Sequence, residues 1–330
     1  MMKAIVYRTY GPPDVLKLEQ IPKPTPKDNE VLVQVHAASA NPGDWHILRA
    51  DPFFARFTTG LFRPKHKVLG FDVVGRVEAT GRNARQFQSG DAVYGDLSEN
   101  RWGAFAEYAC ARENAFALKP ANLTFEQAAA VPLAGVTALQ GLRDTGKIQA
   151  GQRVLINGAS GGVGTFAVQI AKSFGAEVTG VCSTRNVGMV RSIGAEHVID
   201  YTQEDFTKNG QQYDLIFDAV ANHSVSEYKR ALRPQGTCVV AGFSTISHML
   251  QVALLGSWVS KRGGKKIGLM GTARPNARDL VFIGELLESG RITPIIDRRY
   301  PLAEVPDAIR YVETGHARGK VVITVEPSQT

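Results

Sequence analysis

The chain has few cysteines and no long hydrophobic run, and both absences narrow the classes of protein it can belong to. Only Cys110, Cys182 and Cys238 occur among its 330 residues. Their odd number and wide spacing exclude a disulfide framework and a Cys-x-x-Cys metal site, so we expect free thiols, buried or half-buried. No apolar stretch approaches the roughly 20 residues that cross a bilayer, and the N-terminus lacks the layout of a signal peptide. We therefore expect a cytoplasmic protein with no membrane partner.

The composition is that of an ordinary globular protein with a moderate basic excess. Hydrophobic residues make up 44% of the chain and charged residues 21%, both usual values for a soluble domain. Lysine and arginine number 38 against 31 acidic residues, a net charge of +7. Because the basic residues are mostly scattered, we interpret them as a surface that attracts an anionic cofactor, and we do not expect nucleic acid as a partner.

The length favours two domains, and the patterning divides the chain into three stretches. Residues 1–123 carry short alternating strands and turn residues, as in Val31–His36, and predict a β-rich, barrel-like domain. Residues 124–267 alternate helices with short apolar strands, which predicts a parallel, doubly wound α/β sheet. Residues 268–330 contain two amphipathic helices and a strand from Lys320, and we expect them to return to the first domain. The four strands predicted for the α/β sheet are Val154–Ile156, Glu177–Val181, Leu215–Ala219 and Thr237–Ala241.

A glycine-dense turn at residues 158–164 is the most informative motif. It follows the apolar run Val154–Ile156 and precedes a helical pattern, the setting in which such a loop binds a pyrophosphate at a helix N-terminus. Gly161 would let the backbone approach the phosphates, and Gly164 would let the helix pack. Ala159 replaces the first glycine of the usual motif, so a glycine-rich connection without a ligand stays open. The predicted pyrophosphate site comprises Gly158, Ala159, Ser160, Gly161, Gly162, Val163 and Gly164.

The residues after the second strand of the α/β region indicate which cofactor is bound. An NAD-specific site places a carboxylate there to bind the ribose hydroxyls. This chain instead has Ser183, Thr184 and Arg185, whose hydroxyl and guanidinium groups suit a 2′-phosphate, so we predict NADP(H). Alternatively, Ser183 and Thr184 cap the next helix and Arg185 is a solvated charge, and both roles can coexist.

Several motifs together resemble a known family. They are Tyr10-Gly-Pro-Pro-Asp-Val-Leu, Asn41-Pro-Gly-Asp44, Leu69-Gly-Phe-Asp-Val-Val-Gly75, Gly90-Asp-Ala-Val-Tyr-Gly95, Pro132-Leu-Ala-Gly-Val-Thr-Ala138, the glycine turn and Gly319-Lys-Val-Val322. The chain resembles, over essentially its whole length, the zinc-free quinone-oxidoreductase (zeta-crystallin-like) branch of the medium-chain dehydrogenase/reductase superfamily. The resemblance implies a GroES-like barrel domain, a Rossmann domain with the cofactor in the cleft between them, and a homodimer formed through edge strands near residues 258–269.

The zinc ligands of the superfamily's alcohol dehydrogenases are missing from the corresponding positions. Asn41 stands in the place of a cysteine, and Gly70-Phe71-Asp72 replaces Gly-His-Glu. A phenyl ring cannot bind zinc and an amide oxygen is a poor substitute for a thiolate, so we expect no metal. The resemblance then implies hydride transfer from NADPH to a quinone or an α,β-unsaturated carbonyl. The alternatives are an NADPH-binding protein with a non-catalytic partner role and, less favoured, a metal-dependent alcohol dehydrogenase.

The resemblance also implies roles for single residues, each with a plainer alternative. Asn41 would bind the acceptor oxygen or the ribose beside the nicotinamide, or would simply begin a turn. Asp44 would take part in catalysis or anchor its loop by accepting backbone N–H groups, and Thr137 would lie beside the nicotinamide or bond its own helix. Four phenylalanines after Asp51 would form a lid or an acceptor pocket, or would pack a helix on the barrel. The remaining implied cofactor contacts are Tyr201 at the 2′-phosphate, with Val220, Gly242 and Phe243 near the nicotinamide.

Overall fold

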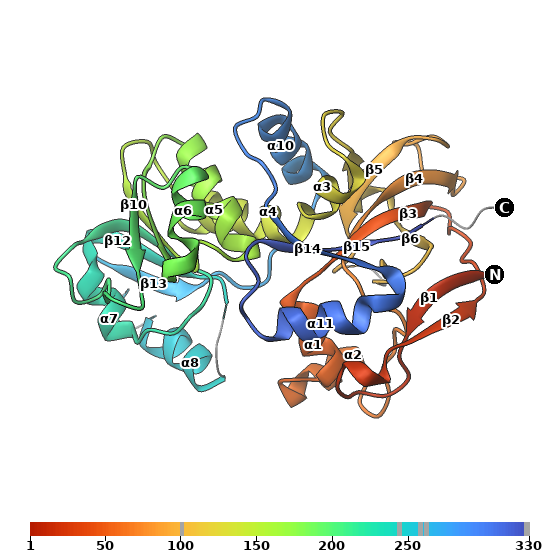
Figure 1. Ribbon diagram of the computed structural model, residues 1–330, viewed down its shortest axis with the longest axis horizontal. Helices are drawn as coiled ribbons and strands as arrows, with labels where there is room; N and C mark the ends of the chain where they lie inside the picture. The colour runs from red at the N-terminus through yellow and green to blue at the C-terminus, as the bar shows by residue number, and fades with distance from the viewer. Residues whose placement is uncertain (100–101, 243–245, 257–259, 261–263, 327–330) are drawn as a thin grey trace. The chain divides into compact units, whose positions relative to one another are not determined.

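The computed structural model describes residues 1–99, 102–242, 246–256, 260 and 264–326 and divides the chain into two compact units (Figure 1). Unit 1 consists of residues 1–133, 274–288 and 294–330, and unit 2 of residues 134–273 and 289–293. The first boundary lies at 133/134, where the sequence predicts 123/124, and the Phe125 ring between these positions stacks on His36 of unit 1 at 4.3 Å. The second lies at 273/274 instead of 267/268, because residues 266–269 pair with the sheet of unit 2.

Unit 1 is built mainly from antiparallel strands. Its larger sheet has the order β14-β15-β3-β4-β5-β7, with β6 also paired to β3, and β1 and β2 form a separate pair. The last strand pairs antiparallel with β3, Val321 opposite Ala40, which confirms the predicted return of the C-terminal stretch. These strands are β1 (Met2–Val6), β2 (Lys17–Ile21), β3 (Glu30–Ala40), β4 (Asp72–Thr80), β5 (Ala92–Asp96), β6 (Tyr108–Arg112), β7 (Phe116–Leu118), β14 (Ile296–Pro301) and β15 (Lys320–Thr324).

Local sequence explains where the helices of unit 1 begin. α3 starts at a capping box in which Gln127 N donates to Thr124 Oγ1 at 3.2 Å, as the Thr124/Gln127 spacing predicts. α1 starts at Pro42, whose fixed φ suits a first turn. The helices are α1 (Pro42–Arg49), α2 (Arg56–Thr59), α3 (Phe125–Ala129), α10 (Ala277–Glu288) and α11 (Val305–Glu313), with 3₁₀ turns η1 (Pro13–Val15), η2 (Phe53–Ala55), η3 (Glu113–Ala115) and η7 (Leu302–Glu304).

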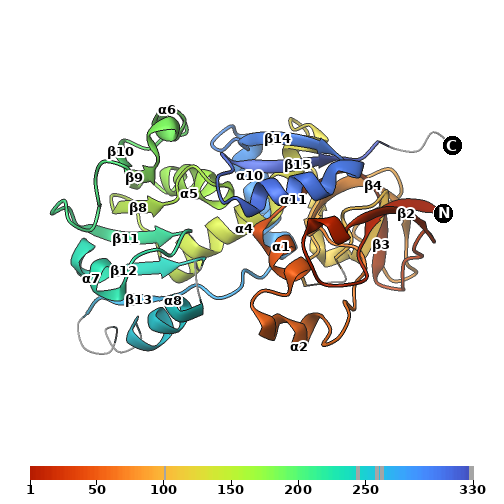
Figure 2. The same ribbon diagram turned by 60° about the horizontal axis from the view of Figure 1, so that its bottom comes forward.

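Unit 2 is a six-stranded parallel sheet in the order β10-β9-β8-β11-β12-β13. Counted from its own first strand this order is 3-2-1-4-5-6, that of a dinucleotide-binding doubly wound sheet, which confirms the predicted α/β fold. α5 and α6 accompany β8 to β10, and α7 and α8 accompany β12 and β13 (Figure 2). The strands are β8 (Arg153–Asn157), β9 (Glu177–Cys182), β10 (His197–Asp200), β11 (Tyr213–Asp218), β12 (Leu232–Val240) and β13 (Lys266–Leu269).

The helices of unit 2 follow from apolar periodicity. α5 buries every residue from Gly164 to Ala171, which includes Phe166, Ala167, Ile170 and Ala171 of its predicted apolar pattern, whereas Val163, the first residue of that pattern, is half-buried. The helices are α4 (Pro132–Gln140), α5 (Gly162–Ser173), α6 (Val187–Ser192), α7 (Val225–Ala231) and α8 (Ile246–Gln251), with η4 (Gly141–Thr145), η5 (Thr184–Asn186) and η6 (Val252–Gly256). All three cysteines are free thiols, and no described helix has the length and apolar character needed to span a membrane.

Candidate functional site

In unit 2, the strand order reverses between β8 and β11, and the glycine turn leaves the sheet at that point. Ligands of open α/β sheets bind outside the carboxyl ends of the strands where the order reverses. Gly161 is the N-cap of α5 and supplies no side-chain cap, so the first N–H groups of the helix have no side-chain acceptor there. These N–H groups belong to Gly162, Val163 and Gly164, and together with the helix dipole they attract an anion.

The glycines of this turn differ in what they do. A Cβ on Gly164 would lie 1.9 Å from the carbonyl oxygen of Gly158, so the fold itself requires glycine there. A Cβ on Gly161 would meet nothing closer than 3.5 Å, so packing leaves room for a side chain at this position. Gly158 has φ +80°, a backbone region that favours glycine. Neither packing nor backbone conformation requires glycine at position 161, so a ligand close to the backbone would account for it.

Ala159, the departure from the usual motif, is accommodated by the neighbouring strand. Its N–H donates to the Val181 carbonyl oxygen at 3.0 Å, which ties the turn to β9. A Cβ built on Gly180 would lie 2.5 Å from the Val190 Cγ1 and 3.0 Å from the Ala159 methyl carbon, so the glycine in β9 leaves room for both side chains. The substitution of alanine for the first motif glycine is thus matched inside the sheet and leaves the turn intact.

The ends of β9 and β10 form a second polar group beside the turn. Asn186 Nδ2 donates to Ser160 Oγ at 3.0 Å and to Ser183 Oγ at 3.2 Å, and so connects the glycine turn with the predicted 2′-phosphate residues. Asn186 Oδ1 is buried and has no hydrogen-bond partner among the described atoms. A buried acceptor without a donor suits a site that is completed by a hydroxyl group of a ligand or by water.

Sequence reasoning missed Asp200, a carboxylate at the end of β10. Thr184 Oγ1 donates to Asp200 Oδ2 at 2.6 Å, and hydrogen bonds from Thr184 and Thr202 lower the pKa of Asp200. The only hydrogen of the Thr184 hydroxyl is therefore directed at Asp200, which leaves Ser183 and the exposed Arg185 as predicted phosphate donors. No sequence signal pointed to Asp200, because only the parallel register of β10 with β9 sets it opposite Cys182. Tyr201 follows directly, with its side chain exposed.

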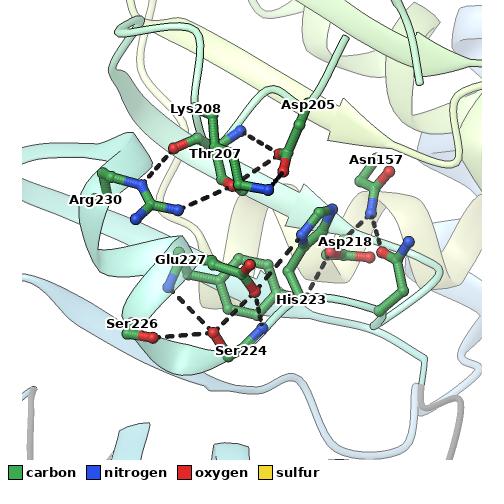
Figure 3. Close-up of polar contacts among 12 residues, drawn as sticks. Asn157, Asp205, Thr207, Lys208, Asp218, His223, Ser224, Ser226, Glu227 and Arg230 are labelled. Atoms are coloured by element: carbon green, nitrogen blue, oxygen red, sulfur yellow. Dashed lines mark hydrogen bonds and ion pairs between the residues drawn. The ribbon is translucent and has the colours of Figure 1, made fainter. Parts of the chain in front are cut away.

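The loop after β11 is held by a buried carboxylate, Asp218 (Figure 3). Asp218 accepts hydrogen bonds from Asn157 Nδ2 at 2.9 Å and from the Tyr228 hydroxyl at 2.8 Å. It also accepts the backbone N–H groups of Val220 and Ala221 at 2.8 and 2.7 Å. Burial and the neighbouring carboxylate raise the pKa of Tyr228, so this tyrosine stays a hydrogen-bond donor.

This network fixes the predicted cofactor residue Val220 above the glycine turn. The Val220 side chain is exposed, and a Cβ on Gly158 would lie 2.7 Å from its Cγ2. Gly242 lies at the end of the next strand, where a Cβ would approach the Ala219 carbonyl oxygen to 2.8 Å. The structure thus brings Val220 and Gly242 to the edge of the sheet that carries the turn, whereas Phe243 lies outside the described residues. Thr137 is partly exposed on α4, and its predicted role remains a prediction.

In unit 1, a buried polar cluster surrounds Asn41. Lys320 Nζ donates to Asn41 Oδ1 at 2.5 Å and to Asp72 Oδ2 at 3.0 Å. Asn41 Nδ2 donates to Asp72 Oδ2 at 3.0 Å and to the Ser39 carbonyl oxygen at 3.2 Å. Asp72 also accepts Ser39 Oγ at 2.5 Å and the Leu133 N–H at 2.7 Å. The exposed fractions of Asn41, Asp72 and Lys320 are 2%, 0% and 3%.

Asp44 anchors the start of α1 to the next loop. Its Oδ2 accepts the Asn41 N–H at 2.8 Å and its Oδ1 accepts the Gly70 N–H at 3.0 Å. These are contacts of the kind expected if Asp44 anchors its loop by accepting backbone N–H groups. Burial raises the pKa of Asp44 to about 8, although the two backbone hydrogen bonds oppose this shift. Burial and the neighbouring Asp72 also raise the pKa of Asp96, whose Oδ1 accepts the Ser98 N–H at 2.7 Å.

The phenylalanine-rich segment after Asp51 forms η2 and α2. Phe53, Phe57 and Phe62 are 63%, 70% and 87% exposed, so their rings do not pack a helix on the barrel. The segment is attached through Tyr10, whose hydroxyl donates to the Gly60 carbonyl oxygen at 2.7 Å and whose ring lies 4.8 Å from the Arg56 guanidinium. The lid or acceptor pocket predicted for these rings remains a prediction.

Comparison with known proteins agrees with this geometry. Residues 27–121 match the alcohol dehydrogenase GroES-like domain family, and residues 193–323 match the zinc-binding dehydrogenase family. The chain is 36% identical to the NADPH-dependent alkenal/one oxidoreductase of Arabidopsis thaliana, over 98% of this chain and 79% of that protein. It is 33% identical to the Arabidopsis thaliana chloroplast envelope quinone oxidoreductase homolog, over 98% of both chains. The chain belongs to the medium-chain dehydrogenase/reductase superfamily.

A solved structure places it in the quinone oxidoreductase-like branch of that superfamily. The quinone oxidoreductase from Coxiella burnetii has a TM-score of 0.86 and 32% identity, over 98% of this chain and 99% of that one. The predicted family and fold class are therefore confirmed. GroES-like and Rossmann-like domains of this superfamily correspond to units 1 and 2.

The donor set around Asn41 does not fit the zinc ion of the superfamily's alcohol dehydrogenases. Asn41 Oδ1 and Asp72 Oδ2 are both bound to the Lys320 ammonium, and Phe71 offers only a ring. Among the described residues, no group of three or more histidine, cysteine, aspartate and glutamate side chains could hold a metal ion. The family named for zinc binding matches residues 193–323, which do not include Asn41, Phe71 or Asp72.

Proposed function

We propose that this protein is a zinc-independent, NADPH-dependent reductase that transfers a hydride to a quinone or to an α,β-unsaturated carbonyl compound. The observation that carries the proposal is the turn at 158–164, which presents free helix N–H groups at the reversal point of a dinucleotide-binding sheet. The relatives named for NADPH-dependent alkenal/one and quinone oxidation–reduction support this choice of acceptor. The amide, ring and ion pair in the zinc-ligand positions support a reaction without a Lewis acid.

The residues of unit 2 fit a phosphorylated dinucleotide. Gly161 leaves room above the helix N-terminus, and Asn186 Oδ1 is a buried acceptor still without a donor. The turn would hold the pyrophosphate, Ser183 and Arg185 the 2′-phosphate, and Val220 and Gly242 the part of the cofactor nearest the switch point. When bound, NADPH supplies the hydride. The protein contributes by holding the cofactor in one orientation and by excluding bulk water from the reacting atoms.

The cofactor preference is tested by Arg185→Ala. Hydrogen bonds to charged groups contribute about 1.5–3 kcal/mol, so we expect the KM for NADPH to rise roughly 10–100-fold. The KM for NADH should change by less than about threefold, since NADH lacks the 2′-phosphate. Arg185→Lys, which keeps the charge, should lie between the two. An equal rise in KM for both cofactors would show that Arg185 does not bind the 2′-phosphate.

The activity is tested by following NADPH oxidation with quinones, enones, enals and simple aldehydes, with and without a chelator. We expect turnover with quinones or conjugated carbonyls that the chelator does not change. If none of these acceptors stimulates NADPH oxidation above background, the proposal is wrong, and tight NADPH binding without turnover would favour the non-catalytic alternative. Turnover that disappears with the chelator and returns with zinc would favour the alcohol dehydrogenase alternative.

We also propose that the protein is a cytoplasmic homodimer that pairs through β13. β13 is the last strand of the sheet in unit 2, and an unpaired strand edge favours association. Lys265 Nζ donates to the carbonyl oxygens of Lys229 and Leu232 at 2.8 and 2.6 Å, so this lysine is bound within its own unit. Lys261 and Arg262 lie outside the described residues. A monomer mass by light scattering at micromolar concentration would contradict the dimer.

A further inference from the structure

Lys320 binds Asn41 and Asp72, two of the three residues in the zinc-ligand motifs of the superfamily's alcohol dehydrogenases; the third is Phe71. Its Nζ is 2.5 Å from Asn41 Oδ1 and 3.0 Å from Asp72 Oδ2. It reaches them because β15 pairs antiparallel with β3, which sets Val321 opposite Ala40 and so places Lys320 beside Asn41. The positive charge that contacts Asn41 Oδ1 and Asp72 Oδ2 is therefore the ammonium group of a lysine of this chain.

The ammonium determines which way the Asn41 amide points. The oxygen of an amide accepts hydrogen bonds and its nitrogen donates two. Here Oδ1 faces Lys320, while the two hydrogens of Nδ2 face Asp72 Oδ2 and the Ser39 carbonyl oxygen. A flipped amide would direct N–H groups at an ammonium. Since both hydrogens of Nδ2 are in use, the side chain of Asn41 has no donor left for a substrate oxygen.

The charges of the cluster balance around one ion pair. Asp44, Asp72 and Asp96 are all buried. Asp72 is the carboxylate that pairs with Lys320: its Oδ2 lies 3.0 Å from the Lys320 Nζ, and both side chains are almost fully buried. A divalent ion at the same oxygens would lie against the ammonium and be repelled.

We propose that Lys320 takes the place of the metal ion in this protein, as an internal cation that neutralises Asp72 and fixes the orientation of the Asn41 amide. This proposal concerns the fold and can be tested without turnover.

The thermal test uses Lys320→Ala, which removes three methylene groups and the ammonium. Removing one partner of a buried ion pair is strongly destabilising, so we expect the melting temperature to fall by roughly 10 °C. The atoms removed equal those of n-propylammonium, and adding this ion at tens of millimolar should restore at least half of the loss. 1-Propanol has a similar shape without the charge and should restore little, as should sodium chloride at the same concentration.

A matched control is Lys17→Ala, which removes an exposed lysine from β2 of the same unit. Its melting temperature should not fall and should not respond to n-propylammonium. If Lys320→Ala melts like the wild type, or if 1-propanol restores it as well as n-propylammonium does, the internal cation is overturned. If Lys320→Ala fails to fold, Lys320→Arg should retain more of the melting temperature than Lys320→Met, and equal losses would overturn the proposal.

Discussion

Gly164→Ala is expected to abolish NADPH binding and to destabilise unit 2, whereas Gly161→Ala is expected to impair binding alone. A Cβ at position 164 would lie 1.9 Å from the Gly158 carbonyl oxygen and 2.9 Å from the Ala159 Cα, so the turn must move. Overpacking of this kind costs about 1–3 kcal/mol, and more where backbone atoms are the obstacle. The displaced turn would no longer direct its N–H groups at the pyrophosphate, so titration with NADPH should show no saturable binding.

Gly161→Ala provides the matched comparison. Its backbone has φ −82° and ψ 175°, which alanine adopts without strain, and its Cβ would meet no atom closer than 3.5 Å. The melting temperature of this variant should therefore stay within about 2 °C of the wild type. The new methyl group would occupy space that the bound pyrophosphate requires, and NADPH affinity should fall about 10–100-fold.

The two variants together distinguish a ligand site from a purely structural turn. If Gly161→Ala binds NADPH as tightly as the wild type, the space above Gly161 is not where the phosphates lie. If Gly164→Ala is as stable as the wild type, the close approach to the Gly158 carbonyl oxygen does not require glycine at position 164. Isothermal titration and thermal unfolding of the same protein samples measure both quantities.

Unit 1 is expected to lose stability as the pH rises from 5 to 8, and Asp44→Asn is expected to reduce that loss. Burial raises the folded-state pKa of Asp44 to about 8, against an ordinary value of 3.8. Between these values the folded state holds a proton that the unfolded state has released, so stability is greatest at low pH and falls as the pH rises. A shift of about four pKa units corresponds to a change of roughly 5 kcal/mol over the full range.

The measurement is urea denaturation of both proteins at pH 5, 6, 7 and 8. The wild type should become less stable at each step, and Asp44→Asn should have a flatter slope, although the raised pKa of Asp96 leaves a residual slope of the same sign. The introduced amide would direct an N–H group at one of the two backbone donors, so the variant should also be less stable at pH 5 by about 1–3 kcal/mol.

Asp205→Asn is the control for the pH slope. Desolvation alone would raise the pKa of Asp205, but hydrogen bonds from Lys208 and Thr207 together outweigh it and lower the pKa to about 2. This carboxylate is therefore ionised in both the folded and the unfolded state between pH 5 and 8. Its removal should change stability by the same amount at every pH in that range. Parallel pH profiles for the wild type and Asp44→Asn would show that Asp44 is ionised in the folded protein.

Local features of the molecule were predictable from the sequence. The capping box at Thr124 and Gln127 and the buried face of α5 involve residues within a few positions of each other. The short apolar strands and the glycine turn are also formed by residues close together in the sequence. The doubly wound sheet could therefore be predicted before its register was known. The sequence also singled out Gly161 and Gly164, and the structure separates them: an added Cβ would lie 1.9 Å from the Gly158 carbonyl oxygen at position 164, and no closer than 3.5 Å to any atom at position 161.

Contacts between distant segments were decided by tertiary structure alone. Parallel register brings Asp200 to Thr184, and antiparallel register brings Lys320 to Asn41 across 279 positions of the chain. Alternation of residue types reports which face of a strand is buried and says nothing about which strand lies beside it. The amino-acid sequence by itself determined the two kinds of domain and the glycine turn between β8 and α5. The folded structure decided that Asn41 faces an ammonium, because only the pairing of the last strand with β3 brings those two side chains together.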